Sequence, residues 1–67
     1  MSYPVNRRVV SFKGDTFIVD LWLVDDKYNA FAQQIYVEDY RVGHSEGLPT
    51  ESIAEFTVIS EIQKKYK

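Results

Sequence analysis

The one pattern in the sequence with the form of a catalytic motif is Gly43-His44-Ser45-Glu46-Gly47, which matches the G-x-S-x-G nucleophile elbow. A serine hydrolase also needs an oxyanion hole, a triad acid and a histidine placed farther along the chain. His44 is the only histidine, it is adjacent to Ser45, and none follows the motif. A parallel sheet with crossover helices does not fit in 67 residues. We therefore interpret the pentapeptide as a polar loop and predict that the protein is not an enzyme.

Two pairs of adjacent carboxylates, Asp25-Asp26 and Glu38-Asp39, are candidate ligands for a hard cation. The residues after Asp25 do not follow the calcium-loop pattern D-x-[DN]-x-[DN]-G. His44 has no second histidine or cysteine to complete a zinc or copper site. We interpret the carboxylates as solvated turn residues and predict no metal and no cofactor.

Each carboxylate pair lies close to a tyrosine, whose amphipathic ring suits a protein interface. We place the centre of a partner-binding surface at residues 38–40 and expect Glu46 to extend it, because functional contacts concentrate on loops. We expect the second cluster, residues 25–28, at the opposite end of the sheet. The predicted partner-binding residues are Glu38, Asp39, Tyr40, Glu46, Asp25, Asp26 and Tyr28.

The formal net charge of −2 conceals an uneven distribution of charge along the chain. All ten carboxylates fall within residues 14–61, together with only two basic residues, Lys27 and Arg41. An acidic surface of this kind bears on the choice of partner rather than on the fold. We predict a non-enzymatic binding module that meets a basic surface on a larger protein. By analogy, its class is the small acidic inhibitor or adaptor, as found among viral accessory proteins.

Two alternative functions follow from other features. The first is nucleic-acid binding, with aromatic side chains stacking on bases and basic ends holding phosphates. It would use Tyr3, Tyr28, Tyr36, Tyr40, Tyr66, Arg7, Arg8, Lys64, Lys65 and Lys67. An isoelectric point near 5.2 opposes it, because nucleic-acid-binding domains are usually basic. The second is a homo-oligomeric structural subunit, in which another copy covers the apolar central strand.

The composition is that of one small folded domain spanning residues 1–67, with 45% hydrophobic and 15% aromatic residues. No apolar segment approaches the roughly 20 residues of a membrane helix. The first residues lack the apolar core of a signal peptide, and the chain has no cysteine. We therefore expect a cytoplasmic protein without a membrane partner.

The longest apolar run, TFIVDLWLV at residues 16–24, predicts a central strand covered on both faces, because apolar residues occupy both of its alternating sides. Residues 6–13 read as the preceding strand, joined to it by a two-residue turn at Gly14-Asp15. That turn pairs Phe12 with Phe17 and Val10 with Val19. It also sets Arg7 across from Trp22 and diagonal to Asp20.

The remaining segments are predicted as two further strands and a loop. Residues 30–38 form a third strand that directs Phe31, Ile35 and Val37 to the core, with a helix beginning at Asn29 as the alternative. Residues 39–50 form a loop, after which Thr50 could cap a single helical turn. Residues 55–64 form the fourth strand.

The predicted fold is mainly β, a small antiparallel meander of about four strands, flat or curled into a partly open barrel. The alternative is α+β, with one helix packed on a three-stranded antiparallel sheet.

Overall fold

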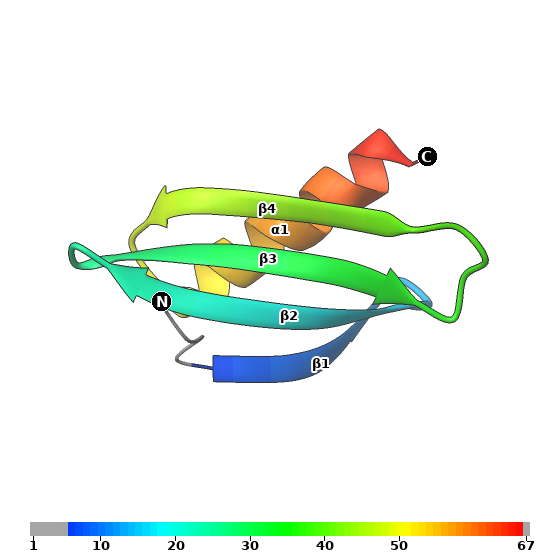
Figure 1. The fold of residues 1–67 in the computed structure, drawn as a ribbon, viewed down its shortest axis with the longest axis horizontal. Helices are drawn as coiled ribbons and strands as arrows, with labels where there is room; N and C mark the ends of the chain where they lie inside the picture. Colours follow the sequence, from blue (N-terminus) through cyan, green and yellow to red (C-terminus); the bar gives the residue numbers. More distant parts are fainter. Residues whose placement is uncertain (1–5, 67) are drawn as a thin grey trace.

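A computed structural model describes residues 6–66 as a twisted antiparallel sheet with one helix lying across a single face (Figure 1). The strands follow chain order in the sheet, so β1 and β4 are its edges and it is open rather than a barrel. The predictions that involve Tyr3 and Lys67 lie outside the described residues. The elements are β1 (Asn6–Phe12), β2 (Asp15–Val24), β3 (Lys27–Ile35), β4 (Arg41–Leu48) and α1 (Glu51–Lys65).

The antiparallel meander is confirmed, but the segment predicted as a loop and the segment predicted as the fourth strand were both assigned wrongly. Residues 41–48 form β4, and residues 55–64 belong to α1. The sequence of β4 holds two glycines and few apolar residues, which is why it resembles a loop. It forms a strand because it pairs with β3, and its small residues Gly43 and Ser45 face the helix. The fold is thus α+β, with four strands where the alternative prediction had three.

Helix α1 begins at a conventional cap. The Thr50 hydroxyl accepts a hydrogen bond from the Ile53 amide at 3.1 Å, and Lys64 and Lys65 lie in the last turn, where cations favour the helix dipole. The buried stripe consists of Ala54, Val58, Ile59 and Ile62. Ile53 and Phe56 are exposed. Without them, the buried positions have helical spacing.

The first hairpin turns at Lys13-Gly14, and not at Gly14-Asp15 as predicted. Both turn residues have positive φ, 52° and 83°, which is the type I′ conformation that fits the twist of a hairpin. The register therefore differs by two residues from the predicted one, and Arg7 lies opposite Asp20 instead of Trp22. A register shift of two residues does not change which side chains share a face of the sheet. The predicted division of β1 and β2 side chains between the two faces is therefore confirmed.

The second hairpin turns at Asp25-Asp26, so β3 starts at Lys27 instead of residue 30. The pairing of β2 with β3 is displaced by three residues, and an odd displacement exchanges the two faces of a strand. Ala30 and Ala32 are buried under the helix, whereas Phe31 points to the opposite face. The prediction that Phe31, Ile35 and Val37 form the core was therefore wrong.

The core lies between the sheet and α1. The helix packs mainly on β4 and β3, which present small side chains to it, and to a lesser extent on the larger side chains of β2. A Cβ added at Gly43 would lie 2.9 Å from Cγ1 of Ile62, so the helix approaches β4 more closely than a side chain there allows. Strand β2 is central but covered on one face only, contrary to expectation. The fully buried residues are Phe17, Val19, Leu21, Ala30, Ala32, Ala54, Val58, Ile59 and Ile62.

Candidate functional site

The sheet face away from α1 has no covering layer in the described chain (Figure 1). Apolar side chains from all four strands point to it, in rows set by the strand pairing. One row runs from Val9 through Ile18 and Gln33 to Val42, and the next consists of Arg7, Asp20, Phe31 and His44. Val9 is 66% exposed and Phe31 is 37% exposed. We call this surface the open face and define it by Val9, Ile18, Trp22, Phe31 and Val42.

The charges at the centre of the open face neutralise each other. The Arg7 guanidinium donates two hydrogen bonds to the Asp20 carboxylate, with Nε 2.6 Å from Oδ1 and an Nη 3.0 Å from Oδ2. The hydrogen bonds to Asp20 and its negative charge raise the pKa of Arg7 above its usual value. The pair therefore contributes little net charge, and the middle of the face combines apolar groups with a fixed ion pair.

Exposed carboxylates that form no ion pair with another described residue lie at the turn between β2 and β3. Asp25 and Asp26 are exposed there, both with positive φ. Because β4 runs antiparallel to β3, with Leu48 opposite Tyr28, exposed Glu46 lies towards this same end of the sheet. The structure thus groups Glu46 with Asp25 and Asp26, and not with residues 38–40 as expected. Tyr28 lies on the helix side, partly buried against the core, and is no part of the open face.

The β3–β4 connection holds the other predicted residues at the opposite end of the sheet (Figure 1). Asp39 accepts hydrogen bonds from Arg41 Nε at 3.0 Å to both of its oxygens, and these bonds lower the pKa of Asp39. Its charge is therefore compensated, while Glu38 and Tyr40 are exposed. Tyr36, absent from the predicted site, is 88% exposed and has a φ of 63°. No pattern in the sequence marks it, because the predicted register placed it within a strand.

The Gly43–Gly47 motif lies in β4, and its serine and histidine point to opposite faces. Ser45 is buried on the helix side, where its Oγ donates to the Ala54 carbonyl at 3.2 Å. His44 is exposed on the open face, opposite Phe31. This alternation separates the two side chains, as expected for neighbours in a strand. The Ser45 hydroxyl therefore links β4 to α1 through a hydrogen bond.

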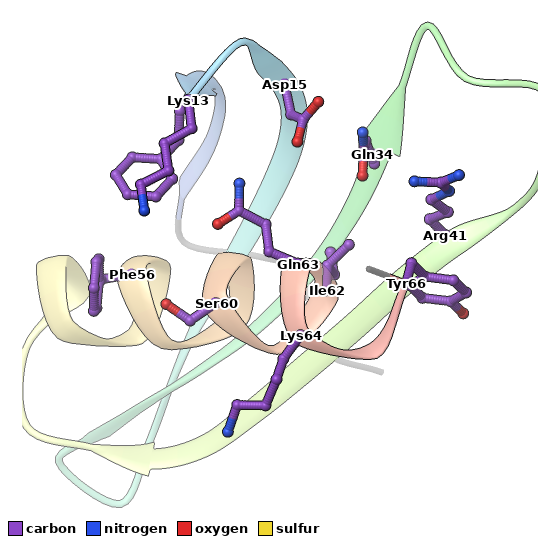
Figure 2. Close-up of a pocket in the computed structure, with 11 residues that line it drawn as sticks. Lys13, Asp15, Gln34, Arg41, Phe56, Ser60, Ile62, Gln63, Lys64 and Tyr66 are labelled. Atoms are coloured by element: carbon purple, nitrogen blue, oxygen red, sulfur yellow. The ribbon is translucent and has the colours of Figure 1, made fainter.

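Some basic residues near the chain ends form ion pairs, and others line a groove. Arg8 bridges from β1 to the helix, with hydrogen bonds to Glu51 at 2.7 Å and Glu55 at 3.1 Å, and Arg7 is paired with Asp20. Lys13 and Arg41 lie at opposite ends of a groove of about 510 Å³ between the β1–β2 turn and the C-terminal half of α1, and Lys64 also lines it, although its ammonium group points away from Lys13 (Figure 2). The other residues lining the groove are Phe12, Asp15, Gln34, Phe56, Ser60, Ile62, Gln63 and Tyr66.

Other candidate sites receive no support from the geometry. Among residues 6–66, no group of three His, Asp or Glu side chains is placed to hold a metal ion. Within the same range, no helix is both long and apolar enough to span a membrane. The chain matches no model of a known protein family, and comparisons with curated proteins and with solved structures give no significant match. Any statement of function therefore depends on the open face and the groove.

Proposed function

We propose that this protein is a non-enzymatic binding module that docks its open face on a larger protein. The observation that supports the proposal is the exposure of Val9 and Phe31 on a sheet face with no covering layer in the described chain. Water contact with such side chains is unfavourable by about 25 cal/mol for each Å² of apolar surface. A partner that covers the face removes that contact.

Charge complementarity defines the chemistry of the partner. Asp25, Asp26 and Glu46 form an acidic group towards one end of the sheet, and Glu38 adds an exposed carboxylate at the other end. The central Arg7–Asp20 pair is neutral overall. The complementary surface has an apolar centre and basic residues at its rim. A small acidic protein that covers a surface of this kind acts as an inhibitor or adaptor.

Replacing Phe31 by Lys should weaken partner binding by at least about tenfold, because it removes an apolar contact and sets a cation against the basic rim. The matched control is Ile53→Lys on the helix, since Ile53 has a similar exposure of 45% and lies on the other side of the molecule. With the protein as bait, a lysate protein that Ile53→Lys retains and Phe31→Lys loses is the expected partner. Both variants should keep the wild-type melting temperature.

Two results would contradict this proposal. One is a partner whose affinity is lowered equally by both variants or by neither. The other is a dimer in sedimentation experiments that Phe31→Lys dissociates, which would make the open face a contact between copies of this chain.

Replacing the acidic group by amides should slow association with the basic partner. We expect the triple variant Asp25→Asn, Asp26→Asn, Glu46→Gln to associate about tenfold more slowly at low salt, with a weaker dependence on ionic strength. Asparagine is chosen for the turn because it tolerates positive φ. Association rates at two ionic strengths measure the effect, with Glu61→Gln on α1 as the control. Glu38→Gln, measured alongside, tests the contribution of residues 38–40. Unchanged rates in the triple variant would remove the acidic group from the interface.

A further inference from the structure

The two edge strands of the sheet differ in regularity. Strand β4 pairs with β3 through a register shift between Tyr28 and Ala30, and Gly47 at that end has a φ of 69°. Such irregularities protect an edge, because they twist its backbone away from a further strand. Every residue of β1 pairs with β2 without a shift, and its sequence NRRVVSF holds no proline or glycine. No described segment lies beyond β1 in the sheet, so β1 is the edge open to another strand (Figure 1).

The charged side chains of β1 are bonded to carboxylates of their own chain. Charges on an edge strand usually discourage pairing with a further strand. Here Arg7 Nε lies 2.6 Å from the Asp20 carboxylate. Arg8 donates to Glu51 at 2.7 Å and to Glu55 at 3.1 Å. An approaching strand therefore meets cations that are already neutralised, and β1 contains no carboxylate of its own.

The turn of the first hairpin determines which backbone groups of β1 are directed outward. The residues that flank a two-residue turn, here Phe12 and Asp15, form a hydrogen-bonded pair, and such pairs alternate along antiparallel strands. The even-numbered residues of β1 therefore bond to β2. The residues whose amide and carbonyl groups point away from β2 are Arg7, Val9 and Ser11. This outward row is symmetric about Val9.

We propose that two copies of this chain join their β1 strands antiparallel about a two-fold axis at Val9, forming one continuous sheet. The two Val9 residues then lie opposite each other, and Arg7 of each copy lies opposite Ser11 of the other. All outward amide and carbonyl groups of the row are paired in this register. An axis at residue 8 would set Arg8 against Arg8, and an axis at residue 10 would set Arg7 against Lys13, which like-charge repulsion disfavours. The sequence of β1 is thus complementary to itself, and a second copy is the strand that fits.

The edge contact is separate from the docking of the open face on a partner, and neither depends on the other. Phe31 lies on β3, two strands away from the β1 edge. Val9 begins the row that continues through Ile18 to Val42, so the dimer sets the open faces of two copies side by side. One pair of short strands makes a smaller contact than the roughly 1,600 Å² of a standard interface. We therefore expect a dissociation constant of about 10–100 μM.

Sedimentation equilibrium between about 5 and 500 μM protein tests the proposal, with the mass expected to rise from one chain to two. Val9→Pro removes an amide hydrogen that points away from β2, at a kind of edge position where proline is tolerated. This variant should weaken dimerisation at least about tenfold. The matched control is His44→Pro on the opposite edge, because the same alternation directs the His44 amide away from β3. It should leave the dimer unchanged.

Side-chain variants cover the case in which proline unfolds the hairpin. Val9 is 66% exposed, so Val9→Lys should keep the fold while setting two ammonium groups against each other at the axis. It should also weaken dimerisation at least about tenfold, whereas Phe31→Lys, the same new charge away from the edge, should not.

Amide hydrogen exchange checks the register directly. The amides of residues 7, 9 and 11 should exchange more slowly at high protein concentration, and those of residues 42, 44 and 46 on β4 should not change. The proposal is overturned by a mass of one chain throughout the concentration range. It is equally overturned by a dimer that His44→Pro or Phe31→Lys dissociates as effectively as the Val9 variants, or by protection gained on β4 instead of β1.

Discussion

Leu21→Asp should abolish cooperative folding, and Val19→Asp should do the same. Both side chains are fully buried between the sheet and α1, with no described basic residue in the core to pair with a new carboxylate. Burying an unpaired charge costs several kcal/mol. A domain of 67 residues is stable by only about 5 kcal/mol. Far-UV circular dichroism during heating and urea titration measures the loss.

The matched control for this result is Ile18, which lies next to Val19 on the same strand. Ile18→Asp places an identical charge on the open face, where the side chain is only partly buried and can reach water. We expect this variant to unfold cooperatively, with a modest decrease in midpoint. If Leu21→Asp melts like Ile18→Asp, the assignment of the two faces of β2 is incorrect.

Gly43→Ala and Ile62→Ala should each destabilise the protein, and the double variant should be destabilised by less than their sum. The methyl group of alanine at position 43 meets Ile62 at 2.9 Å, and overpacking of this kind costs about 1–3 kcal/mol. Ile62→Ala empties a fully buried position and costs about 2–5 kcal/mol. With Ile62 shortened, the added methyl group occupies part of the cavity. Urea unfolding of the four proteins gives the coupling free energy.

Gly47→Ala provides the control for that coupling. Its φ is 69° and no atom lies within 4 Å of the added Cβ, so its cost is backbone strain of about 1–2 kcal/mol. It does not touch Ile62, and combining it with Ile62→Ala should be additive. Additivity of Gly43→Ala with Ile62→Ala, by contrast, would mean that the helix does not pack on β4 at Gly43.

The first hairpin and the central strand could be predicted from the sequence because their apolar residues alternate over many positions. The exact positions of the turns could not be predicted from the sequence. Lys13, Asp25 and Asp26 adopt positive φ, a conformation that local sequence seldom reveals in residues other than glycine. A turn displaced by one or two residues changes the register of everything that follows, and the odd shift at Asp25-Asp26 turned Phe31 from core to surface.

The helix and the functional surfaces depend on tertiary contacts that no local pattern contains. Gly43 and Ser45 look like loop residues until α1 is known to lie against them. Asp39 looks like a free carboxylate until Arg41 is found beside it. Similarly, the groove is lined by residues of the β1–β2 turn and of the C-terminal half of α1, which are far apart in the sequence. The sequence predicts an acidic protein, and only the three-dimensional arrangement shows which of its charges are paired and which are exposed.

The order of the strands bears on how quickly the chain reaches this structure. Each strand pairs with its neighbour in the sequence, and α1 folds back onto the strand that precedes it. The pairing of the strands therefore needs only short loops, whose closure carries a small entropic penalty, whereas the packing of α1 on the sheet joins distant residues, such as Arg8 and Glu51, which are 43 positions apart. Isolated hairpins form in about 1–10 μs, and a sheet that grows by adding one hairpin to the next avoids the slow pairing of distant strands. We expect the hairpins to form early in folding, so that the apolar segments of the strands spend little time exposed to aggregation.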